Sequence, residues 1–280
     1  MMTEKISACI MTFNEESNIE RCLKSVEWCD EIVILDSFST DRTLEIARRY
    51  TDQIHQHEWQ GYIGQRNRIR GMATHPWVLF LDADEEVSPE LREAIHQEFQ
   101  PDRSAYVGYR FPRRVYYLNR WILHGEWYPD IKLRLFKKAL GHSIGEEPHD
   151  QVIVDGPVKT LRAPLYHYTY DDLADHIMTL NRFSSISARA KYEAGDKFRW
   201  SALLFRPFFR FVRGYFFKFG FLDGRRGLLI ALISSFGVAM KYAKLWELIH
   251  VSTPTPQERK GLNGGGVDEK SHNAGLQNTP

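Results

Sequence analysis

The most constraining feature of this sequence is a run of five apolar residues, 77–81, that leads directly into Asp82 and Asp84. A strand that is buried on both faces has this pattern, a continuous apolar run with a polar end. In open α/β sheets, ligands bind at the carboxyl ends of such strands, and Mg²⁺ is commonly held by one or two carboxylates together with substrate phosphates. The run therefore predicts a site for a divalent cation and a phosphate.

A plainer interpretation of the same stretch is also open. Ser88-Pro89-Glu90 has the composition of an N-cap and first helical turn, so the acidic residues before it could simply lead into a helix. The choice between a ligand site and an acidic turn depends on the rest of the chain.

The length and composition of the chain limit what it can be. With 280 residues, it can form one large or two small domains. Its net charge of +1 argues against nucleic acid as the main partner. The three cysteines lie within the first thirty residues without metal-binding spacing, and residues 1–5 lack a secretory signal, so we expect a cytoplasmic location.

Strands and helices alternate in the first hundred residues. Strands are expected at 6–11, 31–35 and 77–81 and, more weakly, at 53–59, with helices after Asn18 and over 42–50. This alternation predicts an α/β fold with a mostly parallel sheet and flanking helices. Asn14, Asp36, Asp82 and Asp84 would then lie at one edge of the sheet. Neither the dinucleotide-binding nor the P-loop glycine motif is present.

The middle of the chain is rich in aromatic residues. Further strands are expected at 105–111, 131–138, 149–154 and 165–168, followed by a helix over 171–194. The tyrosines and tryptophans between 116 and 128 could be core residues or a platform for sugar rings.

Residues 202–222 hold nine aromatic residues and four cations, of which Arg206, Arg210 and Arg213 would form one stripe on a helix. The apolar stretch 227–240 is shorter than the roughly 20 residues that a membrane-spanning helix needs. We therefore expect 202–250 to attach to a membrane surface, although packing on the sheet domain or a dimer contact would also fit. The predicted domains are 1–170 (catalytic), 171–251 (helical, membrane-associated) and a disordered tail, 252–280.

Several motifs occur in a recognisable order. They are Met-Thr-Phe-Asn-Glu-Glu at 11–16, Leu-Asp-Ser-Phe-Ser-Thr-Asp-Arg-Thr at 35–43, Gly-Gln-Arg-Asn at 64–67 and Leu-Asp-Ala-Asp-Glu at 81–85. Together they resemble the family 2 glycosyltransferases, inverting enzymes with the GT-A fold. Residues 132–136, 148–150, 220–224 and 241–246 resemble one branch, the bacterial lipopolysaccharide-core transferases that place glucose on the inner-core heptose.

The resemblance assigns roles to individual residues. Asp84 would contact a divalent metal, Mg²⁺ or Mn²⁺, and Asp82 would contact the metal or the ribose of the donor. Asp36 would lie near the uridine, and Ser37 takes the place of a second acid that many relatives carry. The other substrate-binding candidates are Thr12, Asn14, Glu15 and Arg66. Arg66 suits a phosphate because a guanidinium matches phosphate oxygens, but it could also be a solvated cation.

Transfer with inversion needs one carboxylate as general base for the acceptor hydroxyl. Glu146, Glu147 and Asp150 follow the metal motif, and Asp150 is our choice because it occupies the acid position of the family-like Pro-His-Asp segment. His149 and His167 could assist in binding metal or phosphate, although a histidine at a strand end is more often structural.

The expected function is transfer of a hexose, first of all glucose from UDP-glucose, onto a lipid-linked core oligosaccharide at the inner membrane surface. Transfer to another cell-envelope polysaccharide is the main alternative. A nucleotidyltransferase also uses paired acids and a metal, but residues 12–16 lack its usual glycine- and lysine-rich loop. A membrane-bound module that binds nucleotide-sugars without turnover is the non-enzymatic alternative.

Overall fold

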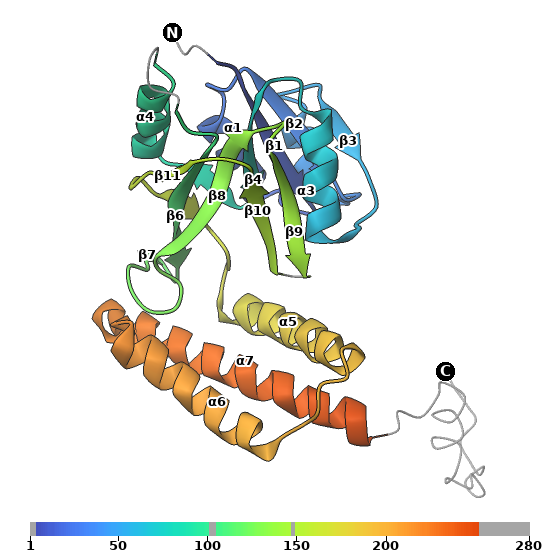
Figure 1. Ribbon diagram of the computed structural model, residues 1–280, viewed down its shortest axis with the longest axis vertical. Coiled ribbons are helices and arrows are strands. Elements are labelled where there is room, and N and C mark those ends of the chain that lie inside the picture. The colour runs from blue at the N-terminus through green and yellow to red at the C-terminus, as the bar shows by residue number, and fades with distance from the viewer. Residues whose placement is uncertain (1–3, 101–104, 147–148, 252–280) are drawn as a thin grey trace, which may run out of the picture.

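The computed structural model describes residues 4–100, 105–146 and 149–251. An α/β part holds the sheet, and three long helices form a separate layer against one end of it (Figure 1). The last sheet strand ends at His167 and the first long helix of the layer begins at Leu173. The predicted tail, 252–280, lies outside the described residues.

The first half of the sheet is parallel, as predicted. Its strands lie in the order β3 (Ile54–Gln56), β2 (Glu31–Asp36), β1 (Ile6–Thr12) and β4 (Trp77–Asp82). Side chains on both faces of these strands are buried, because alternate residues of each strand enter two different hydrophobic clusters. The register places Thr12 beside Asp36 and Met11 beside Asp82, so the carboxyl ends of the strands meet at one edge.

Beyond β4 the sheet is mixed, with both antiparallel and parallel pairs of strands. The next strands are β8 (Asp130–Lys137), β6 (Gly108–Tyr117), β12 (Leu165–His167) and β5 (Glu85–Val87). Two short strands, β7 (Arg120–Trp121) and β11 (Val158–Thr160), pair with β6. The strand expected at 105–111 begins later, at Gly108, and continues past Pro112 to Tyr117. Its pairing with β8 has a register shift at Tyr109/Arg110.

The two faces of the sheet are covered differently. Helices α1 (Ile19–Ser25), α2 (Thr43–Ala47) and α4 (Pro89–Glu98) contribute to the cluster on one face. Helix α3 (Gly61–Met72) and the hairpin of β9 (Gly141–Glu146) and β10 (His149–Val154) cover the other. Ser88 caps α4 by accepting a hydrogen bond from the Leu91 amide at 3.0 Å, so the predicted helix start is confirmed.

The C-terminal layer consists of α5 (Leu173–Glu193), α6 (Trp200–Val212) and α7 (Gly224–His250) (Figure 1). A π-helical turn, η1 (Arg213–Phe217), and a 3₁₀ turn, η2 (Gly220–Asp223), connect α6 to α7. Helix α7 packs on both α5 and α6.

The apolar stretch that we expected to end before Lys241 continues as a helix of 27 residues. Lysine is a good helix former, so Lys241 and Lys244 do not end the helix, and Lys244 Nζ donates to Asn181 and to the Ser184 and Ser185 hydroxyls of α5. Residues 220–250 are in fact long and apolar enough to cross a membrane, judged by length and composition alone.

Candidate active site

The turns after β1 and β2 are joined at the carboxyl edge of the sheet. The Asn14 amide donates to Ser39 Oγ, and the Thr40 amide donates to Asn14 Oδ1, both at 2.8 Å. Asn14 has a φ of 53°, a left-handed conformation that asparagine adopts more readily than most residues. Asn14 therefore fixes the shape of the rim between these two strands.

Asp36 lies beneath this rim and is fully buried. Its carboxylate accepts hydrogen bonds from the Ser39 amide and from Gln56 Nε2, each at 2.9 Å, and from the Ser39 hydroxyl. Asp36 thus holds the turn that meets Asn14. Nearby, Gln65 Nε2 donates to Ser37 Oγ at 3.1 Å, and Thr12 Oγ1 is buried without a hydrogen-bond partner in the described part of the chain.

Asp82, at the end of β4, is held by two arginines. Arg66 Nη2 donates to Asp82 Oδ1 at 2.9 Å and to Oδ2 at 3.2 Å, and Arg134 Nη2 donates to Oδ2 at 2.7 Å. Burial acts to raise the pKa of Asp82, but Arg66, Arg134 and Arg113 outweigh it and hold that pKa well below its usual value. Asp82 is therefore ionised and compensated before any ligand binds.

The arginine pairing extends away from Asp82. Arg134 also donates to Glu85 Oε1 at 2.8 Å, and Arg113 joins Glu85 to Asp130 at 3.3 Å and 2.7 Å. These groups come from β8, β5 and β6. We did not predict Arg134, Arg113 or Glu85 as site residues. An arginine within the apolar run 133–136 could have indicated a buried acidic partner.

Asp84, by contrast, has a histidine as its partner. His167 Nε2 lies 3.0 Å from Asp84 Oδ2, and the Tyr168 amide donates to the Asp84 carbonyl at 2.9 Å. His167 Nδ1 is buried and has no hydrogen-bond partner in the structure as described. Within the described ranges, no group of three or more His, Cys, Asp or Glu side chains could hold a metal ion. Asp84 and His167 fit a cation that takes most of its ligands from a bound substrate, because Mg²⁺ needs few protein ligands.

Asp150 reaches this site from the β9–β10 hairpin. Its Oδ2 lies 2.7 Å from Arg66 Nε, on the same guanidinium that holds Asp82. The hairpin is fixed to α3 because Asn67 exchanges two hydrogen bonds of 2.9 Å with the backbone of Ser143. The other predicted base candidates, Glu147 and the side chain of Glu146, lie outside the described residues, and so does the side chain of His149, which was expected to assist in binding metal or phosphate.

Glu15 faces the two aspartates from the turn after β1. Burial is the largest cause that raises the pKa of Glu15, and Asp84, Asp171 and Asp82 act in the same direction. A hydrogen bond from Asn18 acts to lower the pKa, and the net result is a pKa of about 7. Asp84, Asp171 and Asp82 thus place negative charge near Glu15 at this edge, although burial accounts for most of the shift.

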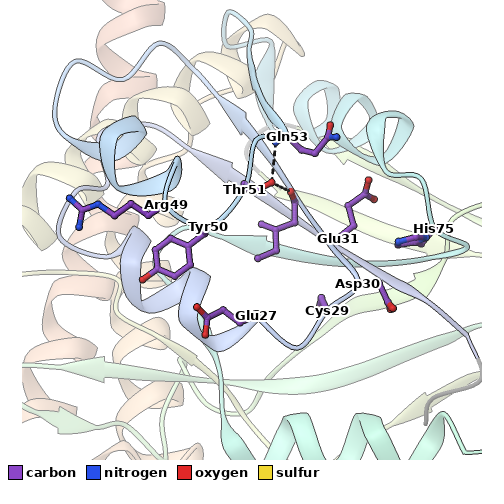
Figure 2. A pocket seen from close by; sticks show the side chains of 10 residues that line it. Glu27, Cys29, Asp30, Glu31, Arg49, Tyr50, Thr51, Gln53 and His75 are labelled. Carbon is purple, nitrogen blue, oxygen red and sulfur yellow. Dashed lines mark hydrogen bonds between the residues drawn. The ribbon is translucent and has the colours of Figure 1, made fainter.

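The cavity drawn in Figure 2 lies elsewhere. It measures about 520 Å³ and is lined by residues such as Glu31, at the start of β2, and His75, just before β4. Both lie at the opposite ends of these strands from Asp36 and Asp82. None of the predicted site residues lines it. Glu31 also bonds Ser7 and Thr74, so its carboxylate has a structural role.

The predicted basic stripe of α6 does not face outward as a row of unpaired charges. Arg206 bonds the Tyr242 hydroxyl, and Arg210 and Arg213 pair with Glu126. The outer surface of α6, η1 and η2 is instead aromatic and apolar. Its exposed side chains are Trp200, Leu204, Phe205, Phe208, Phe209, Phe216, Phe217, Phe219, Phe221 and Leu222.

Comparison with known proteins gives consistent matches. Residues 7–154 match the family model described as Glycosyl transferase family 2. An uncharacterized glycosyltransferase of Rickettsia typhi is 30% identical over 258 residues, covering 88% of each chain. The lipopolysaccharide core biosynthesis glycosyltransferase LpsC of Rhizobium meliloti is 29% identical over 252 residues, covering 85% of this chain and 93% of LpsC. Among solved structures, S. aureus TarS 1–349 in complex with UDP-GlcNAc aligns with a TM-score of 0.47 and 17% identity, over 84% of this chain and 81% of that chain.

Proposed function

Because the chain belongs to glycosyltransferase family 2, we propose that it moves a hexose, first of all glucose from UDP-glucose, onto the inner-core heptose of lipopolysaccharide or a similar membrane-bound glycan. The observation that carries the proposal is the convergence of Asp82, Asp84 and Asp150 at the carboxyl edge of the parallel strands. The match to LpsC over most of the chain supports a core-oligosaccharide acceptor.

The donor would bind across the rim of the sheet. Thr12, Asn14, Glu15, Asp36 and Ser37 surround the place for the uridine, with Asp36 acting through the turn that it holds. Asp84, together with His167 and with Asp82 close by, would hold the divalent cation. When bound, the cation neutralises the charge that develops on the departing diphosphate.

Arg66 would support the same diphosphate from α3. Its Nη1 atom is buried and has no hydrogen-bond partner among the described residues, so it keeps donors that a phosphate oxygen would satisfy.

Asp150 would act as the general base. The acceptor hydroxyl gives its proton to Asp150 while its oxygen bonds to the anomeric carbon, and the bond from that carbon to the diphosphate breaks with both electrons leaving on UDP. Attack from the face opposite the leaving group inverts the anomeric centre. Asp150 Oδ2 is paired with Arg66, so the Oδ1 atom is the one that we assign to the acceptor proton.

The helical layer would attach the enzyme to the inner membrane surface. The aromatic surface of α6, η1 and η2 suits the interface between headgroups and acyl chains. We propose peripheral attachment, because α5 packs along α7 and exposes Arg182, Arg189 and Glu193, which are poorly suited to hydrocarbon.

The test is transfer by the purified full chain. A panel of UDP-sugars is offered with Mn²⁺ or Mg²⁺ to a lipid-linked core oligosaccharide that ends in heptose, and the anomeric configuration of the product is read by NMR. A β-linked glucosyl product from α-linked UDP-glucose supports the proposal. Transfer of another sugar favours a different envelope polysaccharide, whereas UDP binding without any transfer or donor hydrolysis favours the non-catalytic binding protein.

A further inference from the structure

Three cations gather around one glutamate where the helical layer meets the α/β part. Arg210, Arg213 and Lys218 each place a nitrogen near the carboxylate of Glu126, at 3.2, 3.5 and 3.5 Å. Only 6% of the Glu126 side chain is exposed. We call these four residues the elbow cluster, because the cations lie at the bend between α6 and α7: Arg210 in the last turn of α6, and Arg213 and Lys218 in the bend itself.

The elbow is fixed in place by contacts next to the cluster. The Gly125 amide donates to the Lys218 carbonyl at 2.8 Å, and Asp223 accepts from the amides of Leu123 and His124 at 3.2 and 2.8 Å. The backbone also packs closely, since a Cβ on Gly214 would lie 3.0 Å from Glu126 Cγ. These contacts therefore fix the backbone that carries the cations.

The charges in the elbow cluster do not balance. Three cations share one carboxylate, and among the residues that the structure describes no second carboxylate lies within salt-bridge distance of them. Arg210 Nε is buried without a hydrogen-bond partner in the same ranges, while 58% of the Arg213 side chain is exposed. Burial lowers the pKa of nearby Lys241, and Lys191, Arg206 and Arg210 lower it further, which indicates excess positive charge along this side of the layer.

The surroundings indicate the kind of anion that would complete the cluster. Phe209, Phe216 and Phe217 are exposed on the same bend, and Phe217 is 75% exposed. An anion placed here would lie at the boundary between the three cations and an apolar surface. A phosphate matches the guanidinium and ammonium donors, and an attached pair of acyl chains would match the aromatic side chains.

We propose that Arg210, Arg213 and Lys218 form a binding site for the phosphate group of a membrane phospholipid. The proposal rests on the membrane attachment in the proposed function and assigns it a defined headgroup contact. The loop that contains Glu126 leads into Asp130, which pairs with Arg113, so the proposed lipid site is connected to the α/β part.

The test uses a soluble lipid, so that adsorption to a bilayer does not contribute to the measured binding. Dihexanoyl-phosphatidylglycerol below its micelle-forming concentration is titrated calorimetrically into the full chain. We expect saturable binding of one lipid, weakened at least tenfold in the double variant Arg213→Gln, Lys218→Gln. The matched control, Lys197→Gln with Arg199→Gln, removes the same charge from the far end of α6 and should bind as the parent does. Equal weakening in both double variants, or no binding to the parent, would overturn the proposal.

Further arms separate the remaining explanations. Glu126→Gln removes the competing carboxylate and keeps all three cations, so lipid binding should be retained or strengthened; a loss as large as in the cluster variant means that the cations only hold the fold. Inorganic phosphate that binds as tightly as the lipid would overturn the assignment to a phospholipid. Stabilisation of each variant by UDP reports the donor site independently, so failure at the elbow is distinguishable from failure of the proposed function.

Discussion

Asp82 at the end of β4 and Asp150 at the start of β10 are joined by one guanidinium, that of Arg66. One residue belongs to the predicted metal motif and the other is the predicted base, and they come from different layers of the α/β part. Arg66, from α3, lies between them with 4% of its side chain exposed. The two halves of the proposed reaction, departure of the diphosphate and deprotonation of the acceptor, therefore share a positively charged centre.

Replacing Arg66 should destabilise the protein as well as inactivate it. Arg66→Met leaves Asp150 without its cation and Asp82 with Arg134 alone, and removal of one partner of a buried ion pair costs about 3 kcal/mol or more. Urea denaturation measures the loss. Arg68→Met, at an exposed position on the same helix, should change the free energy of unfolding by less than about 0.5 kcal/mol. Similar losses in the two variants would contradict the central position of Arg66.

Asp150→Asn should separate binding from chemistry. The amide cannot accept the acceptor proton, so transfer should fall at least about 100-fold, while stabilisation by UDP with Mn²⁺ stays as in the parent. Asp155→Asn, exposed beyond the end of the same hairpin, is the control and should retain activity. Unchanged transfer by the Asp150 variant would remove this residue from the role of base.

Glu15 should make stability fall as the pH rises. Its pKa is about 7 in the folded protein against an ordinary value of 4.5. The stability that protonated Glu15 contributes to the fold is therefore fully present below pH 4.5 and is lost as the pH rises through 7. The difference in the free energy of unfolding between Glu15→Gln and the parent should therefore shift in favour of the variant as the pH rises. We expect a shift of roughly 1 kcal/mol between pH 5 and pH 8, after discounting for the partial exposure of Glu15. Urea titrations at the two pH values give the difference. A pH-independent difference would show that Glu15 ionises normally.

His176, in the helical layer, should make stability depend on pH in the opposite direction. It lies buried against Tyr117, Trp127 and Tyr170, with its Nδ1 atom 2.8 Å from the Tyr117 hydroxyl, and burial lowers its pKa from 6.5 to about 4. Its contribution to stability is present above pH 6.5 and is lost as the pH falls towards 4.

Between pH 7 and pH 5 the parent should therefore lose up to about 2 kcal/mol more than His176→Gln. His142→Gln, at an exposed position, should follow the parent. A variant at position 176 that tracks the parent at both pH values would show that folding does not lower the pKa of this histidine.

The sequence predicted the parallel strands because each is a local apolar run that ends in polar residues. The positions of Asp36, Asp82 and Asp84 at one edge followed from that pattern. Arg134, Glu85 and the contact of His167 with Asp84 did not follow, because they depend on how strands β8, β5 and β12 are ordered in the sheet, and no local pattern encodes that order. The Glu126 contacts were missed for the same reason, since Glu126 lies 84 residues from Arg210.

The most direct test of the account is stabilisation by UDP in the presence and absence of Mn²⁺. With UDP and Mn²⁺ well above their dissociation constants, the thermal midpoint of the parent should rise by about 5 °C, and EDTA should remove most of the rise. Asp84→Asn should abolish the Mn²⁺-dependent part and His167→Gln should weaken it, because these two side chains are the proposed protein ligands. An equal rise in the parent and the Asp84 variant, or no rise in the parent, would contradict a cation and diphosphate site at the end of β4.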